Sequence, residues 1–431
     1  MTKSKDQEPR ILVIAEFAPG AAGGDWVNIK QHFRGLDWSQ IYWWSFSGPS
    51  GIKSHEFGGK HSSCQIPPRL TPNQKWNGLK SWILDSFIIP HAARHLLSFI
   101  RLAQPDFIFL MARGWMIPLG HRVMPQVKAH WHVALYDMPD VDGMMQRLGR
   151  QRTDRFMNMA DALYRNASSR SVISPAMAEE MRMRTGVACS TFFRCSVEPE
   201  ALARLRQPLP PPQDDVIRIG YAGSILAEPT FVRLVKALQM IRPQLGHRVE
   251  IHLYGSQRYT NRDWFDSSLI IEHGFISEAE LHRLYQQGTW GLAIMHLDDT
   301  DPRYNLYSFP CKFTMSLASG LPLICIGHPQ SPLIELARNY RLGLLLTEND
   351  DKALAQRLLE GLADFSRFGE YRAGMARCAE KEVNAEQNRR KLHELLYATC
   401  ALARRNNPVT DTKATDSRPQ AGPPPHPRNK A

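Results

Sequence analysis

Residues 308–324 read SFPCKFTMSLASGLPLI and join a helix-like run, a break and a strand-like run. Pro310 suits the first turn of a helix, Ser308 is a suitable cap for it, and Gly320 is a suitable stop. Lys312 then falls in the first turn, where a cation opposes the helix dipole. We therefore expect Lys312 to share a bound anion with backbone N–H groups; the alternative is a lysine that points into solvent.

Apolar runs that end in glycine turns, each followed by a helical segment, recur along the chain. Residues 11–17 lead into PGAAGGDW, and a second series starts at VIRIGYAG. Apolar runs at 41–46, 106–112, 129–137 and 169–174 predict further strands. The segment 175–186 predicts a helix, because it has an early proline, late arginines and a terminal glycine. This alternation is typical of an α/β fold with parallel sheets.

The proline-rich RQPLPPPQDD separates the two series and can be neither a helix nor a central strand. The tail after residue 405 contains many prolines and almost no large apolar residues, which predicts disorder. The expected organisation is a disordered N-terminus (1–9), a first domain (10–205), a linker (206–215), a second domain (216–365), C-terminal helices (366–404) and a disordered tail (405–431).

The composition is that of a soluble globular protein, with 43% hydrophobic and 22% charged residues in a chain of 431. A net charge of +11 favours an acidic partner: nucleic acid, an anionic membrane surface or a phosphorylated ligand. The seven cysteines show no C-x-x-C pair, which indicates reduced thiols. Because no signal peptide or membrane span is evident, we expect a cytoplasmic protein.

Several segments together resemble the GT-B glycosyltransferases. IGYAGS, VEIHLYGS, IIEHGFISEAELHRLYQQGTWGLAIM, SFPCKFTMSLASGLPLI and RLGLLL follow the order and spacing of the nucleotide-sugar-binding domain of these enzymes over about residues 216–347. ILVIAEFAPGAAGG and SVISPAMAEEMRMRTGVACSTFFRCSVE are similar to parts of their first domain. The resemblance implies two Rossmann-like domains that face each other across a cleft, with the C-terminal helices packed back on the first domain.

The same resemblance implies a function. A sugar would pass from a nucleotide-diphosphate donor on the second domain to a hydroxyl of a saccharide or lipid-linked acceptor on the first. No cofactor and no metal would be needed. Helix N-termini and glycine turns at the carboxyl ends of parallel strands are suited to bind the phosphates.

The expected donor-binding residues come from the matched segments. Lys312 and Arg303 are candidates for the diphosphate, and Tyr307 and Ser308 for the sugar or ribose. The complete expected set is Gly223, Ser224, Tyr254, Gly255, Ser256, Phe275, Arg303, Tyr307, Ser308, Phe309, Pro310 and Lys312. A single glycine turn is more often only a tight connection, so the set depends on several turns occurring together.

The chain departs from the family at two points. Many retaining members carry a pair of glutamates before the Gly-x-Pro, and Tyr307 and Met315 stand at those positions here. The Arg and Lys pair that often grips the diphosphate is absent from GSILAEPTFVR. The sequence is similar to divergent branches with S-x-P-x-K before the helix, which often act in envelope polysaccharide assembly.

Three aspartates are candidates for a catalytic base in an inverting displacement: Asp25, Asp137 and Asp140. Asp25 follows Gly23 and Gly24 in the glycine loop that is expected to face the acceptor. Each could equally be a loop aspartate that bonds its own backbone. Tyr136 stands where retaining relatives often have a histidine.

Other signals carry less weight. His130 and His132 alternate along a strand as metal ligands can, but no third ligand is evident, and the acidic residues 298–301 fit a solvated turn. Residues 75–103 mix tryptophans and other apolar residues with lysines and arginines, which suits either an anionic membrane surface or an ordinary buried helix pair.

Two other functions stay open. One is a catalytically silent protein that binds a sugar nucleotide or acts as a scaffold, and the other is a nucleotide-sugar epimerase on the same fold. Nucleic-acid binding is disfavoured, because basic residues do not alternate with aromatics on a known module.

Overall fold

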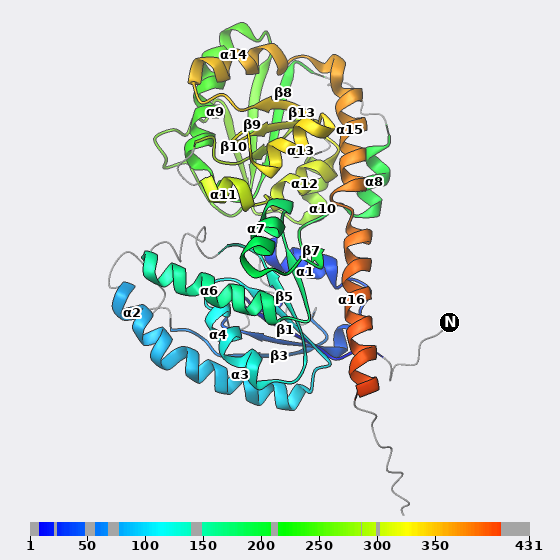
Figure 1. Ribbon diagram of the computed structural model, residues 1–431. Helices are drawn as coiled ribbons and strands as arrows, with labels where there is room; N and C mark the ends of the chain where they lie inside the picture. Colours follow the sequence, from blue (N-terminus) through cyan, green and yellow to red (C-terminus); the bar gives the residue numbers. More distant parts are fainter. Residues whose placement is uncertain are drawn as a thin grey trace, which may run out of the picture.

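The computed structural model describes residues 8–20, 24–47, 57–67, 77–138, 149–207, 214–285, 287–298 and 302–406. It contains two parallel sheets, each with helices packed against it, and they form two lobes that are stacked one above the other in Figure 1. The fold is α/β with two Rossmann-like units, as the alternation of apolar runs and helical segments predicted.

The first sheet has the strand order β3-β2-β1-β4-β5-β6-β7 and is parallel throughout. Its strands are β1 (Ile11–Ala15), β2 (Ile41–Ser45), β3 (Lys60–Ser63), β4 (Phe107–Ala112), β5 (His130–Leu135), β6 (Ser169–Val172) and β7 (Thr191–Phe192). The helical segments of this part are α1 (Gly24–His32), η2 (Trp38–Gln40), α2 (Asn77–Ile83), η5 (Leu84–Ile88), α3 (Ile89–Ala103), α4 (Met116–Val123), η6 (Met124–Gln126), α6 (Arg150–Asn166), α7 (Pro175–Thr185) and α8 (Pro199–Leu205).

The second sheet has the order β10-β9-β8-β11-β12-β13 and is also parallel. Its strands are β8 (Val216–Ala222), β9 (Arg248–Tyr254), β10 (Ile270–Gly274), β11 (Trp290–Ile294), β12 (Leu323–Ile326) and β13 (Gly343–Leu346). Its helical segments are α9 (Glu228–Ile241), η7 (Arg242–Gln244), α10 (Glu278–Tyr285), α11 (Pro302–Tyr307), α12 (Cys311–Ser319), α13 (Pro332–Tyr340), α14 (Asp351–Gly361) and η8 (Phe365–Arg367).

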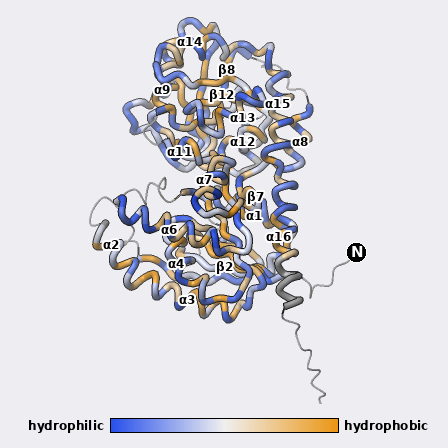
Figure 2. The backbone as a smooth tube through the Cα atoms, viewed as in Figure 1, coloured by the Kyte–Doolittle hydropathy of each residue, from blue (hydrophilic) through white to orange (hydrophobic). Residues whose placement is uncertain are grey.

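The central strands are buried on both faces, which explains why they read as continuous apolar runs. Every residue of β1 and β4 is buried. Full burial of a large aliphatic or aromatic side chain contributes about 1.5–3 kcal/mol, so these strands hold the first lobe together. Helix α3 is amphipathic, and Figure 2 shows hydrophobic and hydrophilic residues alternating along it. Its buried face includes Leu96 and Ile100.

The C-terminal helices connect the lobes. Helix α15 (Phe368–Lys381) packs against α13 and α8, and α16 (Ala385–Asn406) packs against α1, β4, β5 and β7 (Figure 1). The backbone N–H of Val197 donates to the carbonyl of Val383 at 2.6 Å, and that of Ala385 donates to the carbonyl of Val197 at 3.0 Å. This pairing holds the start of α16 beside the segment that follows the first sheet. Among the described helices, none combines the length and apolarity needed to cross a membrane.

Candidate active site

Glycine turns follow β8 and β9, which are neighbouring strands in the second sheet. The N–H of Gly223 donates to the carbonyl of Tyr254 at 2.7 Å, and the N–H of Gly255 donates to that of Gly274 at 2.9 Å. Gly223 has φ +95°, which L side chains rarely adopt. A Cβ on Gly255 would lie 3.3 Å from the carbonyl carbon of Gly223. Side chains are excluded here, so backbone groups can approach a ligand closely.

Lys312 extends from the first turn of α12 to these glycine turns. Its Nζ donates to the hydroxyl of Tyr221 at 3.0 Å and to the carbonyl of Ser224. A Cβ on Gly223 would come within 2.9 Å of Lys312 Cε, so the lysine lies directly against the turn. Burial lowers the pKa of Lys312 to about 8. The structure thus brings Gly223, Ser224 and Lys312 together, and their role in donor binding stays a prediction.

The start of α12 differs from expectation. Ser308 was expected to cap this helix, but that expectation is wrong: α12 begins at Cys311, and Pro310 precedes it as the N-cap residue without a side-chain bond. The reason is that the N–H of Ser308 donates to the carbonyl of Tyr304 at 3.0 Å, which places Ser308 at the end of α11. The buried Ser308 hydroxyl has no hydrogen-bond partner. Such a group is a candidate to contact a ligand.

Arg303 and Tyr307, the other residues expected near the sugar and diphosphate, contact α7 of the first lobe. Arg303 pairs with Glu180 at 3.2 Å and lies over the ring of Tyr307, 5.0 Å from its centre. The Ser174 hydroxyl donates to the Tyr307 carbonyl at 2.8 Å. These contacts join the two lobes at α11, so in this structure the Arg303 guanidinium has a protein partner.

The remaining expected donor residues differ in exposure. Tyr254 is buried and stacks on His273, with ring centres 4.6 Å apart. Ser256 is exposed, and Phe275, just after β10, is 77% exposed. Phe309 is buried beneath the guanidinium of Arg194, 4.8 Å from its ring centre. The structure therefore leaves Phe275 and Ser256 accessible to a ligand, whereas Phe309 lies in the packing between the lobes.

On the first lobe, Arg113 joins two of the three candidate aspartates. Its Nη1 lies 3.3 Å from Asp25 Oδ2, and its Nε lies 3.4 Å from Asp137 Oδ2. Asp25 was expected in a loop, but it lies in the first turn of α1, together with Gly24, where a carboxylate suits the helix dipole. Burial raises the pKa of Asp25, against the opposing effect of Arg113. Asp140 and Gly23 lie outside the described residues.

A buried chain of hydrogen bonds links this cluster to the second lobe. The hydroxyl of Tyr136 bonds the Asp25 carboxylate and lies 3.1 Å from Sγ of Cys311. Cys311 is in turn hydrogen-bonded to Cys195 and precedes Lys312 in α12. Because a carboxylate only accepts hydrogen bonds, Tyr136 donates to Asp25, and the Cys311 thiol can donate to Tyr136.

Sequence reasoning missed the roles of Arg113, Tyr136 and Cys311. Arg113 directly follows β4, and the carboxyl ends of neighbouring parallel strands meet at one edge. The position of Arg113 at the end of β4 could therefore have marked it as a candidate site residue. Nothing in the local pattern indicated that Tyr136 and Cys311 would meet.

One histidine of the predicted pair, His132, has no ring nitrogen available to a metal. His132 is buried, and its ring nitrogens bond the hydroxyls of Ser169 and Ser171 at 2.8 and 2.9 Å. Within the part of the chain that the structure describes, no group of three or more His, Cys, Asp or Glu residues is placed to hold a metal ion.

Of the acidic residues 298–301, the structure describes only Asp298, whose carbonyl accepts a hydrogen bond from Asn305; residues 299–301 are outside the described part.

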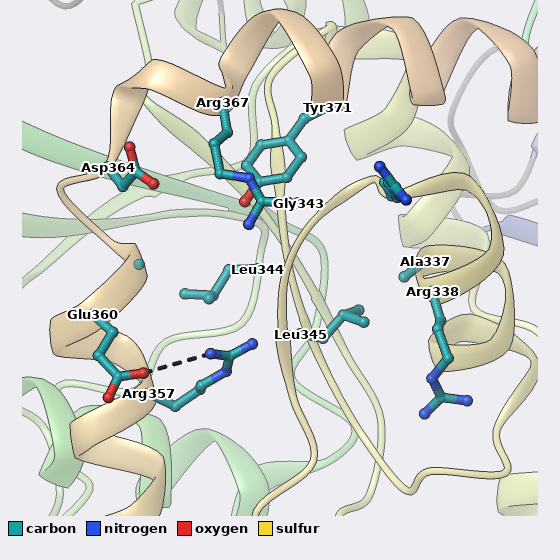
Figure 3. A pocket seen from close by; sticks show the side chains of 12 residues that line it. Ala337, Arg338, Gly343, Leu344, Leu345, Arg357, Glu360, Asp364, Arg367 and Tyr371 are labelled. Atoms are coloured by element: carbon teal, nitrogen blue, oxygen red, sulfur yellow. Dashed lines mark hydrogen bonds and ion pairs between the residues drawn. The ribbon is translucent and has the colours of Figure 1, made fainter.

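A separate pocket of about 210 Å³ lies beside the outer strand β13, near Gly343 at the amino end of that strand (Figure 3). Four arginines line it, of which Arg357 pairs with Glu360 at 3.5 Å and Arg341 with Glu370 at 2.7 Å. In parallel α/β sheets, ligands bind at the carboxyl ends of the strands. Its position therefore disfavours this pocket as the donor site.

The arrangement of the two sheets is that of known glycosyltransferases. Sucrose-phosphate synthase from Thermosynechococcus elongatus superposes with a TM-score of 0.67 at 17% identity, over 92% of this chain and 100% of that one. HepE of Anabaena, in complex with UDP, has a TM-score of 0.61 at 14% identity, over 90% of this chain and 100% of that one. UGT89C1 of Arabidopsis thaliana, complexed with quercetin, has a TM-score of 0.53 at 15% identity, over 91% of this chain and 100% of that one.

The chain has the GT-B fold, as its resemblance to that class predicted. At these identities the likeness is one of fold. No protein-family model matches the sequence, and no curated protein does.

Proposed function

We propose that this protein is a glycosyltransferase that moves a sugar from a nucleotide-diphosphate donor to a hydroxyl of a saccharide or lipid-linked acceptor. One observation carries the proposal beyond the fold. A continuous chain of contacts from Asp25 through Tyr136 to Cys311 connects a carboxylate cluster on the first lobe to the Lys312 turn on the second. A base for the acceptor and a cation for the departing diphosphate are the two groups that such a transfer needs.

The donor would bind across the glycine turns of the second lobe. The N-terminus of α12, with Lys312, would face the diphosphate, and the turns at Gly223 and Gly255 would allow close backbone approach. Phe275 and Ser256 are exposed beside the end of β10 and would contact the nucleotide. The unpartnered hydroxyl of Ser308 would bond the sugar or ribose.

Asp25 is the preferred general base of the three candidate aspartates. Its pKa is raised by burial, and a base works best when its pKa approaches the working pH. Arg113 holds Asp25 and Asp137 together, and Tyr136 orients Asp25 by a hydrogen bond. A carboxylate that removes the acceptor proton while the hydroxyl attacks the sugar opposite the diphosphate gives inversion. The cation at Lys312 stabilises the charge that develops on the leaving group.

A sugar-nucleotide-binding protein without transferase activity is the second candidate. One observation favours it: both described aspartates pair with the same arginine, so neither carboxylate can take up the acceptor proton without weakening an ion pair. Under this alternative the donor turn would bind a nucleotide, but no sugar would be transferred.

A thermal-shift screen with UDP, GDP, CDP and dTDP tests the donor site, because a ligand that prefers the native state raises its stability. We expect one of them to raise the melting temperature of the native protein, and a Lys312→Ala variant to lose that shift. Lys391→Ala, an exposed position on α16, is the matched control and should keep it. No shift with any nucleotide would refute the donor site. Release of nucleotide from the matching sugar nucleotide then separates a transferase from a binder.

We also propose that the first lobe contacts an anionic membrane from the cytoplasmic side, where envelope polysaccharides use lipid-linked acceptors. Leu79, Trp82 and Phe87 in α2 and η5 are each more than half exposed, at 52%, 52% and 58%. Trp82 and Phe87 meet edge to face at 5.5 Å, and Lys80 lies among them. An apolar patch with basic residues suits the headgroup region.

Liposome flotation tests this contact. With vesicles that contain anionic lipid, we expect the protein to float and Trp82→Ser to reduce the floated fraction. Leu102→Ser, 72% exposed at the far end of α3, is the matched control. Absence of flotation, or an equal effect of both variants, would refute the membrane contact.

A further inference from the structure

Two cysteines from different lobes lie in contact beside the candidate donor site. Cys195 follows β7 and is buried, and Cys311 is the first residue of α12. Their thiols are hydrogen-bonded to each other, and the hydroxyl of Tyr136 lies 3.1 Å from Sγ of Cys311. The next residue after Cys311 is Lys312, whose Nζ reaches the glycine turn. These two thiols therefore connect the part of the chain that carries the candidate base to the helix that carries the candidate cation.

The surroundings of Cys311 favour its thiolate. Cys311 stands at the N-terminus of a nine-residue helix, whose dipole stabilises an anion. Cys195 can donate a hydrogen bond to its sulfur, and this bond lowers the pKa of Cys311. Cys311 is partly exposed, whereas Cys195 is buried, so Cys311 is the more accessible residue of the two. A reactive thiol with a second thiol in contact is the arrangement of a redox-responsive pair.

We propose that a hydroperoxide oxidises Cys311 and Cys195 to a disulfide that ties α12 to the first lobe and closes the donor site. In the first step the Cys311 thiolate attacks the peroxide, the O–O bond breaks, and Cys311 becomes a sulfenic acid as hydroxide or alkoxide leaves. In the second step the Cys195 sulfur attacks that sulfur, the S–O bond breaks, and water leaves. One hydroperoxide thus accepts the two electrons that both thiols lose.

The geometry explains why the bond would affect ligand binding. A disulfide draws two sulfur atoms to about 2.05 Å, closer than a hydrogen bond allows. The first residue of α12 is then covalently fixed to the segment after β7. Because Lys312 is the next residue, the cation and the helix N-terminus lose the freedom to adjust around an anion. The disulfide itself forms or fails to form whatever ligand the site takes, so it does not depend on the proposed transferase activity.

Peptide mapping of the full-length native protein provides the test. After treatment with hydrogen peroxide, free thiols are alkylated and the protein is digested with trypsin. Cleavage after Arg194 and Arg204 gives CSVEPEALAR, and cleavage after Arg303 and Lys312 gives YNLYSFPCK, so each cysteine lies in its own short peptide. We expect these two peptides to appear linked, with the loss of two hydrogen atoms, and to separate again with dithiothreitol. Two unlinked peptides in folded, oxidised protein would overturn the proposal, as would a link from Cys311 to another cysteine.

Two variants test the consequence. Cys195→Ser keeps a hydrogen-bond donor beside Cys311 and should retain the nucleotide-induced melting shift after peroxide, whereas the oxidised wild type should lose it. Cys189→Ser removes another partly buried thiol, which bonds the carbonyl of Thr191 at 2.8 Å, and should behave like wild type. If the oxidised wild-type protein gives the linked peptides but keeps its nucleotide-induced melting shift, the proposal that the disulfide closes the donor site is wrong. If reduced wild type shows no shift with any nucleotide, the donor site fails while peptide mapping still decides the disulfide.

Discussion

Replacing Lys312 by methionine should stabilise the free protein and abolish nucleotide binding. The side chain keeps its length but loses a charge that burial disfavours, as the lowered pKa of about 8 against an ordinary 10.5 shows. Each pKa unit corresponds to about 1.4 kcal/mol, so the buried charge costs about 3 kcal/mol at neutral pH. A residue that destabilises the free protein in this way is expected where a ligand supplies the missing partner.

The net gain is smaller because Lys312 also donates two hydrogen bonds. Its bonds to the Tyr221 hydroxyl and the Ser224 carbonyl contribute about 1 kcal/mol each. The carbonyl stays satisfied in the variant, since the Tyr221 hydroxyl also donates to it at 3.0 Å. We therefore expect Lys312→Met to raise the free energy of unfolding by about 1–2 kcal/mol at pH 7, which is a few degrees in melting temperature.

The sign of the pH dependence follows from linkage. Between pH 8 and 10.5 the unfolded chain holds a proton on Lys312 that the folded chain has released, so wild-type stability rises with pH in that window. The advantage of Lys312→Met is therefore full at pH 7 and disappears towards pH 10.5. Thermal melts of both proteins across this range measure it, with Lys391→Met as the exposed control. A variant that is less stable than wild type at pH 7, or an advantage that does not change with pH, would refute the reasoning.

The other predictions concern the glycine turn and the carboxylate cluster. Gly223→Ala adds strain of about 1–3 kcal/mol and a Cβ against the lysine, whereas Gly246→Ala, with φ +64° and open space around it, adds strain alone. Both should lower the melting temperature, but only the first should remove the nucleotide shift. Asp25→Asn should reduce transfer about 100-fold or more with little change in melting, and Asp137→Asn less; near-normal turnover in both would sink the base assignment. Arg113→Gln should raise the pKa of Asp25 and move the acid limb of the pH–rate profile upward, and an unmoved limb would count against the pairing.

Much of the fold could be predicted because its signals are local. The apolar runs at 11–17 and 106–112 became β1 and β4, which are buried on both faces. The helix predicted at 175–186 is α7, capped by Ser174 and ended by Gly186. The edge strands β3 and β7 were not predicted. Lys60–Ser63 is polar and Thr191–Phe192 has two residues, so their pairing depends on the neighbouring strand rather than on their own sequence.

The site was predictable only where it follows strand ends. Gly223 and Lys312 are far apart in sequence, yet both occur at positions where parallel strands and helix N-termini place ligand-binding groups, and the structure brings them together. The ion pairs of Arg113 depend on how α1, β4 and β5 are arranged, which no single segment specifies. The contact between Tyr136 and Cys311 depends on how the two lobes dock.

The donor site and the thiol pair share the N-terminus of α12, and this leads to one further prediction. The helix dipole and the Lys312 cation stabilise whichever anion is present, a bound diphosphate or the Cys311 thiolate. A diphosphate placed there repels a second negative charge on the adjacent sulfur, so it should raise the pKa of Cys311 and slow its reaction with peroxide. The measurement is the rate at which the linked tryptic peptide forms, with and without a saturating nucleotide from the thermal-shift screen. The Lys312→Met variant, which should not bind the nucleotide, is the control in which the rate should not change. A linked peptide that forms equally fast in wild type with and without bound nucleotide would show that the two anions do not compete for one helix terminus.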